Sequence, residues 1–466
     1  MFLINPKSLS DISIITENNR DITYDELYQE IDKFKQYIKH RSIIFIIGGN
    51  DYFSLVCYLA SLEITAVPLL LSSNLDNYNL SLLIKTYDPK FIFGKIMTKD
   101  NNYFGELIHN FGKYGIFERK NSINHSLHKD LALLLTTSGS TGSPKLVRLS
   151  RSNITSNASS ISKYLNINTN DRAITSLPFN YSYGLSVINS HLYSGGSIVL
   201  TKCSMMEKEF WNTIDNKVVT SIAGVPYNYE IMLRLGFERL NISSIKKMTQ
   251  AGGKLDDKKI KKVYDECQSR SIEFYTMYGQ TEATARISYL PTKNTNSKPN
   301  SIGIAIPGGH LWIEDDKGRT ITESNTVGEL FYKGKNVSMG YAETTYDLSL
   351  GDINKGILRT GDLASFDKDG FFYIKGRKNR FVKIFGVRIS LDSLEKMVLD
   401  KGYVCVAIGN DNDLTLYVVD TPKLSVKSLR IDVANSLGIN MLAISVKAVK
   451  EFPRLETGKI NYKLLD

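Results

Sequence analysis

Residues 137–145 have the composition best suited to anion binding in this chain. They follow the apolar run Leu131–Leu135, which predicts a buried strand, so they are expected to form the loop at that strand's end. Glycines let a phosphate approach backbone N–H groups, and the lysine adds a positive charge. The pattern predicts a phosphate-binding loop, with a Ser-, Thr- and Gly-rich surface loop as the alternative. The candidate residues are Thr137, Ser138, Gly139, Ser140, Thr141, Gly142 and Lys145.

Two further segments begin as strands and end in polar or glycine residues. They cover residues 248–255 and 273–282. In open α/β sheets, ligands bind beyond the carboxyl ends of the strands, so both segments are expected to lie beside residues 137–145. The candidates in them are Gly252, Gly253, Tyr278, Gly279, Gln280, Thr281 and Glu282.

Helix and strand patterns alternate over the first 300 residues. Residues 22–38 carry apolar side chains at helical spacing, residues 42–48 indicate a buried strand, residues 52–62 a helix and residues 65–71 another strand. The alternation returns at residues 171–200. Such a rhythm predicts largely parallel sheets covered by helices on both faces.

The pattern changes near residue 300. Short alternating runs at 310–314 and 328–333, separated by glycines, predict a small antiparallel sheet or barrel, and residues 376–379 are expected to form a linker. We therefore predict an α/β protein with two domains. Residues 1–376 would form mainly parallel sheets flanked by helices plus a small β-barrel-like subdomain, and residues 377–466 a small, mobile α+β domain.

The last 90 residues or so contain their own set of elements. Asp392 and Glu395 have capping-box spacing at the start of a helix near residues 392–400. Residues 411–413 are expected to join two strands, and residues 426–437 to form an amphipathic helix.

Composition narrows the class of protein. The 466 residues are 42% hydrophobic and 23% charged, as in folded proteins with more than one domain. The net charge of +10 comes from scattered basic residues, so we expect no nucleic-acid partner. No apolar run is long enough to cross a bilayer and residues 1–10 lack a signal-peptide pattern, which predicts a cytoplasmic protein without membrane insertion. Four widely spaced cysteines predict free thiols.

The motifs together resemble one enzyme family. Residues 139–145 are not a Walker pattern, because no glycine precedes the lysine and no Ser or Thr follows it. With Tyr278–Glu282, Thr360–Asp362, Gly376-Arg377 and Pro453–Lys459, they resemble the AMP-forming acyl ligase superfamily. That superfamily includes acyl-CoA synthetases, adenylation domains of peptide synthetases and luciferases. The motifs occur in family order along the whole chain.

The resemblance implies a reaction that consumes ATP. A carboxylate would join the α-phosphate, pyrophosphate would leave, and the acyl group would pass from AMP to a thiol. Residues 137–145 would hold the β- and γ-phosphates, Thr281 the α-phosphate, and Glu282 a Mg²⁺ ion, with residues 278–280 completing the ATP motif. Both reactants are anions, so positive charge and N–H donors must offset their repulsion.

The same resemblance assigns further nucleotide contacts. Asp362 would accept hydrogen bonds from both ribose hydroxyls, which needs two acceptor oxygens on one side chain. Arg377 would contact the ribose or a phosphate at the domain junction. Gly252 and Gly253 would pack on the adenine, where glycine allows close approach.

Lys459 matches the catalytic lysine of the family, which bridges the attacking carboxylate and the α-phosphate. In the family, the small domain alternates between two orientations, one for adenylation and one for thiol transfer. The pivot position is Asn379, where the family usually has aspartate or lysine. On composition alone, Lys459 would be one solvated lysine among 58 basic residues.

Residues 177–184 align with the family segment that enters the acyl pocket. Amino-acid-activating members place an aspartate there to pair with the α-ammonium group. This chain has no aspartate in that segment, so α-amino acids are disfavoured, since a buried ammonium without a partner is costly. The candidate pocket residues are Asn180, Tyr181, Tyr183 and Val225, with core packing as their alternative role.

The sequence thus predicts an AMP-forming ligase for a small carboxylic acid that uses ATP and Mg²⁺. The thiol acceptor stays open between CoA and the phosphopantetheine of an acyl carrier protein. Two alternatives are an inactive nucleotide-binding scaffold and an amino-acid-adenylating domain that serves a carrier protein.

Overall fold

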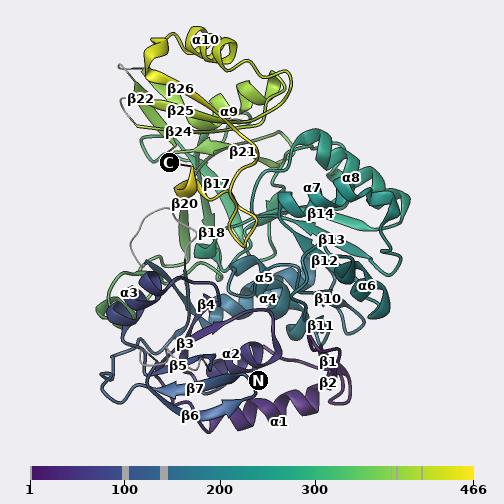
Figure 1. The fold of residues 1–466 in the computed structure, drawn as a ribbon, viewed down its shortest axis with the longest axis vertical. Coiled ribbons are helices and arrows are strands. Elements are labelled where there is room, and N and C mark those ends of the chain that lie inside the picture. The colour runs from purple at the N-terminus through teal and green to yellow at the C-terminus, as the bar shows by residue number, and fades with distance from the viewer. Residues whose placement is uncertain are drawn as a thin grey trace. The chain divides into compact units, whose positions relative to one another are not determined.

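The computed structural model describes residues 3–96, 104–136, 145–378, 380–384, 387–410 and 413–465. The chain divides into two compact units. The first contains residues 1–311 and 332–358, and the second contains residues 312–331 and 359–466. Figure 1 labels their helices and strands.

The first unit contains a nine-stranded sheet in the order β16-β15-β14-β13-β12-β10-β11-β1-β2. Neighbouring strands from β1 through β14 in this order are parallel, whereas β2, β15 and β16 pair antiparallel at the two edges. Because β12, β13 and β14 are parallel, their carboxyl ends lie on the same side of the sheet. The strands are β1 (Ile12–Ile15), β2 (Asp21–Thr23), β10 (Arg172–Ile174), β11 (Ser197–Val199), β12 (Ser221–Gly224), β13 (Lys247–Gln250), β14 (Glu273–Tyr278), β15 (Ser288–Leu290) and β16 (Ile304–Ala305).

An eight-stranded sheet in the same unit has the order β19-β9-β8-β4-β3-β5-β7-β6. Its central strands β8, β4, β3 and β5 are parallel. Strands β8 and β9 form an antiparallel pair in which Thr136 is the partner of Leu146, so residues 137–145 connect them. The strands are β3 (Ile43–Gly48), β4 (Val67–Ser72), β5 (Phe91–Lys95), β6 (Glu106–Phe111), β7 (Tyr114–Glu118), β8 (Leu131–Thr136), β9 (Leu146–Ser150) and β19 (Gly340–Ala342).

Most helices of the first unit begin where the sequence supplies a capping side chain, whereas α5 and α6 lack one. The Thr23 hydroxyl accepts from the Glu26 N–H and the Glu26 carboxylate accepts from the Thr23 N–H, and Ser150 caps α4 in the same way. Helices α7 and α8 lie beside β13 and β14 (Figure 1). The helices are α1 (Tyr24–Lys35), α2 (Tyr52–Glu63), α3 (Asn77–Tyr87), α4 (Arg151–Tyr164), α5 (Ser182–Tyr193), α6 (Lys208–Asn216), α7 (Pro226–Leu235) and α8 (Asp257–Ser269).

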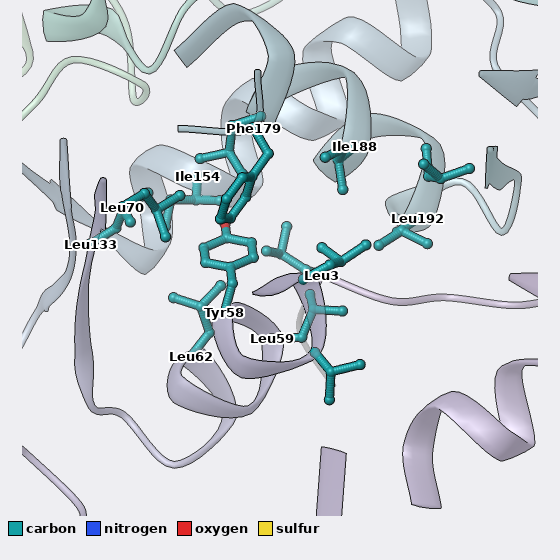
Figure 2. Close-up of a cluster of buried hydrophobic side chains, with 14 of the residues drawn as sticks. Leu3, Tyr58, Leu59, Leu62, Leu70, Leu133, Ile154, Phe179, Ile188 and Leu192 are labelled. Carbon is teal, nitrogen blue, oxygen red and sulfur yellow. The ribbon is translucent and has the colours of Figure 1, made fainter. Parts of the chain in front are cut away.

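The largest core joins both sheets through helices α1, α2, α4 and α5. Figure 2 shows Tyr58 of α2 among aliphatic side chains, and Phe179 belongs to the same buried cluster. Tyr58 is fully buried, and its hydroxyl donates to Asn189 Oδ1 on α5 at 3.3 Å. The ring supplies apolar contact area while its polar atom keeps a partner, as buried tyrosines require. This core fixes α5, whose first turn carries Tyr183 and whose N-cap residue is Tyr181, two of the predicted acyl-pocket residues.

The second unit contains most of a four-stranded sheet in the order β17-β18-β20-β21, a hairpin of β22 and β23, and a three-stranded sheet β24-β25-β26 with helices α9 and α10. In the described residues the four-stranded sheet has no pairing between β17 and β21, so it is not a closed barrel. The elements are β17 (His310–Glu314), β18 (Gly328–Lys333), β20 (Ile357–Phe366), β21 (Phe372–Arg377), β22 (Phe381–Ile384), β23 (Val387–Ser390), α9 (Leu391–Asp400), β24 (Cys405–Gly409), β25 (Leu414–Val419), α10 (Val426–Leu437) and β26 (Ile444–Val449).

The predicted α/β class is confirmed, and two local predictions are wrong. Gly376 and Arg377 belong to β21 and are not a linker. Asp392 and Glu395 do not form a capping box: Ser390 caps α9, while both carboxylates bind Arg380. The tertiary ion pairs with this partly buried arginine replace the local capping interaction.

Two further predictions concern thiols and membranes. All four cysteines are free, and burial raises the pKa of the Cys57 thiol well above its ordinary value. Among the described helices, none has both the length and the apolar character needed to cross a membrane.

Candidate active site

Several predicted site residues lie at the carboxyl ends of β12, β13 and β14 in the nine-stranded sheet. Gly224, Gln250 and Thr276 are aligned in register across β12, β13 and β14. Gly252 follows β13 with φ +83°, and a Cβ atom at this position would lie 2.6 Å from the Tyr181 hydroxyl and 3.0 Å from Val225 Cγ1. Both the backbone conformation and the available space therefore require glycine.

Gly253 also follows the carboxyl end of β13, and a Cβ atom added to it would contact the ring of Pro226 at 3.2 Å. Gln250, the last residue of β13, donates through Nε2 to the Gly253 carbonyl at 2.9 Å. This hydrogen bond holds the chain close to the sheet immediately after the strand ends.

A tight turn after β14 presents Thr281 and Glu282. A Cβ atom on Gly279 would lie 1.6 Å from the Ala285 carbonyl oxygen, so the chain can reverse here only with glycine. Residues 281–283 form a 3₁₀ turn, and Asn336 Nδ2 donates to the carbonyls of Ala283 at 2.7 Å and Arg286 at 2.8 Å. One buried amide thus holds the last residue of the turn and the chain three residues beyond it.

Glu282 is connected to a cation through a tyrosine. The Tyr341 hydroxyl donates to Glu282 Oε1 at 2.7 Å, and Lys145 Nζ lies 3.7 Å from the centre of the Tyr341 ring. Lys145 also approaches Glu343 at 3.7 Å. Burial and the Glu282 charge raise the pKa of Tyr341, which keeps its hydroxyl protonated as a donor. Residues 137–144, the rest of the predicted phosphate loop, lie outside the described residues.

Thr281 meets the predicted acyl-pocket segment. Its hydroxyl oxygen lies 3.1 Å from Ser182 Oγ, in the first turn of α5. Asn50 fixes the chain just before this helix, because its Nδ2 donates to the Thr175 and Leu177 carbonyls and its Oδ1 accepts from the Phe179 N–H. Asn180 follows, half-buried.

Tyr181 and Tyr183 lie beside a buried arginine. Their ring centres are 6.2 Å apart in an edge-to-face arrangement, and the Arg286 guanidinium carbon lies 4.0 Å from the centre of the Tyr183 ring. The Tyr183 hydroxyl is 2.8 Å from the Thr249 carbonyl oxygen, to which it donates. Burial raises the pKa of both tyrosines, and the Arg286 charge opposes that effect.

The second unit holds Asp362 and Arg377 opposite each other on β20 and β21. Arg377 Nε lies 3.3 Å from Asp362 Oδ1, with the Asp362 side chain 6% exposed and the Arg377 side chain 69% exposed. A buried carboxylate is thereby held in position by a neighbour that remains accessible to an anion.

Local backbone hydrogen bonds define the turn that carries Lys459. Leu455 N donates to the Lys459 carbonyl and Gly458 N to the Leu455 carbonyl, each at 2.8 Å, while Arg454 and Ile460 form a β-bridge. Gly458 has φ +75°, which suits glycine. Lys459 therefore lies on a small, defined hairpin of the second unit.

Sequence reasoning missed three residues that contact the predicted site. Tyr341, Ser182 and Arg286 had no role assigned from the sequence. The sequence offers one signal for Arg286, namely a basic residue only four positions after Glu282. Whether a side chain so close in sequence faces a neighbouring pocket or solvent depends on the turn geometry.

Comparison with known proteins identifies the family. The AMP-binding enzyme family matches residues 6–342. The chain belongs to this family. Equisetin synthetase eqxS of Fusarium heterosporum is 28% identical over 292 residues, which is 59% of this chain and 7% of that protein. The 2-succinylbenzoate–CoA ligase of Staphylococcus epidermidis is 23% identical over 466 residues, covering 97% of this chain and 94% of that protein.

Solved structures share the fold of this family member. The o-succinylbenzoate coenzyme A synthetase of Bacillus subtilis with its acyl-adenylate intermediate has a TM-score of 0.78 and 21% identity, covering 98% of this chain and 96% of that chain. The same enzyme with ATP and a magnesium ion has a TM-score of 0.75 and 21% identity, covering 97% and 96%.

Proposed function

We propose that this protein activates a carboxylic acid with ATP. A carboxylate oxygen attacks the α-phosphorus, the bond to pyrophosphate breaks, and acyl-AMP forms. A thiolate then attacks the acyl carbonyl and AMP leaves. The observation that carries the proposal is the 3.1 Å approach of the Thr281 and Ser182 hydroxyls, which joins the predicted nucleotide motif to the predicted acyl segment.

The charges in the first unit suit a magnesium–phosphate group. Mg²⁺ is usually bound by one or two carboxylates together with substrate phosphate oxygens. Glu282 supplies one carboxylate, and the described residues contain no group of three or more metal-ligating side chains that would bind a metal without a phosphate. Lys145, with residues 137–142, would hold the β- and γ-phosphates, and Thr281 the α-phosphate.

Remaining roles follow from the family resemblance. Asp362 would bind the ribose hydroxyls, Arg377 the ribose or a phosphate, and Gly252 with Gly253 the adenine. Lys459 would stabilise the negative charge that develops between the carboxylate and the α-phosphate. Residues 377–466 would move as a domain, with one orientation that brings Lys459 to the site for adenylation and another for thiol transfer.

The acid is proposed to lack an α-ammonium group, because the segment with Asn180, Tyr181 and Tyr183 supplies no carboxylate. The acceptor is CoA or a carrier-protein phosphopantetheine. Similarity to one segment of a large synthetase favours a carrier arm, whereas similarity over nearly the full length of a CoA ligase favours CoA.

ATP–pyrophosphate exchange with a panel of carboxylic acids tests the proposal. We expect exchange that depends on both acid and Mg²⁺, followed by thioester formation with CoA or with pantetheinylated carrier protein. Glu282→Gln should lower exchange at all acid concentrations. ATP binding without exchange for any acid would instead indicate a scaffold, and exchange only with α-amino acids would overturn the proposed substrate class.

A further inference from the structure

Arg286 is a buried cation with only uncharged contacts. The residue is 1% exposed and comes four positions after Glu282. Its Nε donates to Ser186 Oγ at 3.2 Å, its Nη1 lies 2.8 Å from Met277 Sδ, and its guanidinium stacks on Tyr183. Within the described residues, no carboxylate lies within ion-pair distance of it.

The fully buried Arg148 provides a comparison within the same unit. Its guanidinium donates to four backbone carbonyls, those of Met339, Tyr341, Leu350 and Gly351, at 2.5–3.3 Å. Arg148 thus has strong acceptors for its donors, whereas Arg286 has a hydroxyl, a weakly accepting sulfur and an aromatic face. A desolvated charge with such weak partners is costly unless a ligand supplies the counter-charge.

The surroundings of Arg286 are those of the proposed acyl pocket. The Arg286 guanidinium lies over the Tyr183 ring. Tyr181, which is partly exposed, lies next to both Tyr183 and Gly252. A cavity of about 10 Å³, enough for about one water, is lined by Asn157, Ser182 and Ser186, and Ser186 is the serine that accepts from Arg286. The Asn157 Oδ1 atom is buried there without a hydrogen-bond partner.

The guanidinium is displaced from the reacting end of the site. Ser182 approaches Thr281, beside which the α-phosphate would lie, whereas Arg286 contacts Ser186. Ser182 and Ser186 are four residues apart on α5, a separation of about 6 Å along the helix axis. A group bound to Arg286 is therefore a second group of the acid, about one helical turn from the carboxylate that becomes activated.

We propose that Arg286 binds a second anionic group of the acid substrate, so that the enzyme activates short dicarboxylic acids. This inference rests on the proposed function and specifies its substrate class. The second carboxylate would pair with the guanidinium and keep its charge throughout the reaction, while the first loses its charge in the acyl-AMP bond.

Matched acids test the inference on the unmodified enzyme. Succinate, glutarate and adipate are compared with their monoamides in ATP–pyrophosphate exchange, because each monoamide keeps the shape but loses the second charge. We expect kcat/KM for the best diacid to exceed that of its monoamide by about 100-fold, as is usual when one partner of a buried charge pair is lost.

Variants then assign that preference to Arg286. Arg286→Gln should lower kcat/KM for the diacid by about 100-fold and leave the monoamide within about threefold, and Arg286→Lys should restore part of the diacid activity. Arg172→Gln is the control, because Arg172 opens β10 at the amino end of the strand and donates to Ser197 and Lys217. It should leave the diacid-to-monoamide ratio unchanged.

Three results would overturn the inference. Equal activity of the unmodified enzyme with diacids and monoamides, or preference for uncharged acids, shows that no second anion is bound, whatever the variants do. If Arg286→Gln lowers kcat/KM equally for the diacid and its monoamide, Arg286 either binds the reacting carboxylate or is needed for folding. Absence of exchange with every acid, with ATP still bound, refutes the proposed function itself.

Discussion

Lys459 lies in a hairpin defined by backbone hydrogen bonds and by the positive φ of Gly458. The backbone carbonyl of residue 459 makes one of these bonds, and any amino acid at this position keeps that carbonyl. The proposed role of Lys459 is therefore tested at its side chain.

Lys459→Ala is expected to abolish adenylation while sparing the second step. A single preorganised charge donor at a developing negative charge contributes about 10²–10³ in rate, so pyrophosphate exchange should fall at least about 100-fold. Thioester formation from preformed acyl-AMP should stay within about threefold of the wild type. Normal exchange by this variant would remove Lys459 from the proposed mechanism.

Gly252 carries a second prediction at residue scale. Alanine there would place Cβ within 2.6 Å of the Tyr181 hydroxyl, in addition to the strain of a positive φ. We expect a loss of about 1–3 kcal/mol in unfolding free energy together with a higher KM for the acid, since Tyr181 must shift.

Gly308→Ala is the matched control for Gly252→Ala. Gly308 has nearly the same φ, +84°, with no atom within 4 Å of an added Cβ. It should show the conformational cost alone, about 1 kcal/mol, with an unchanged KM. Denaturation midpoints and KM values for the acid substrate, measured on both variants, separate backbone strain from the contact with Tyr181. Equal KM values for Gly252→Ala and Gly308→Ala would contradict a role for that contact.

At the scale of elements, the sequence predicted what depends on periodic patterns. Helix α10 was predicted at residues 426–437 and is found there, because its apolar spacing is a local property. Asp392 and Glu395 were assigned to a cap, yet Arg380 binds both. The pairing of Arg286 with Tyr183 was not foreseen either, since which side chain faces which pocket depends on contacts between segments distant in sequence.

The four-stranded sheet is stabilised by a buried carboxylate on β18. Glu329 accepts from Arg359 through two hydrogen bonds of 2.6 Å and from Lys378 at 2.9 Å, with its side chain 6% exposed. Burial acts to raise the pKa of Glu329, but the hydrogen bonds from the two cations outweigh it, and the pKa is lower than usual.

This carboxylate should make the sheet sensitive to acid. A group whose pKa is lowered on folding contributes stability above its unfolded pKa of about 4.3, and the contribution is lost as pH falls through the lower folded value. Glu329→Gln should therefore lose about 1–3 kcal/mol at pH 7, with the difference from wild type shrinking towards pH 3.

The control for Glu329→Gln is Asp316→Asn, because Asp316 faces the same Lys378 at 3.8 Å with a fully exposed side chain. Exposed pairs contribute little, so this variant should follow the wild-type curve. Denaturant midpoints measured between pH 3 and pH 7 give the comparison. A difference between Glu329→Gln and wild type that does not change with pH would contradict the assignment.

At the scale of the molecule, the proposed reaction uses residues of both compact units, Glu282 from the first and Lys459 from the second. The proposed two-step reaction requires motion of the C-terminal residues, and the sequence predicts residue 379 as the pivot. Lys378 is bound to the four-stranded sheet through Glu329 and the Gly361 carbonyl. Arg380 is bound to α9 through Asp392 and Glu395.

Asn379 thus separates two anchored neighbours, although its own structure lies outside the described residues. A pivot there would leave both anchors intact. Among the described residues it would disturb two hydrogen bonds that cross residue 379, from the Arg377 N–H to Asp392 Oδ2 at 2.9 Å and from the Arg380 N–H to the Arg377 carbonyl at 3.2 Å. Few residues need to absorb such a domain rotation.

Asn379→Pro should uncouple the two half-reactions, because proline fixes φ and restricts the residue before it. If the domain is held in one orientation, one half-reaction should stay near the wild-type rate and the other should fall at least about tenfold. The two half-reactions are measured as pyrophosphate exchange and as thioester formation from acyl-AMP. Asn379→Ala, which keeps backbone rotation, should leave both rates unchanged. If both rates are also unchanged in Asn379→Pro, rotation does not occur at residue 379; if Asn379→Ala reproduces the uncoupling, the side chain and not backbone rotation is responsible.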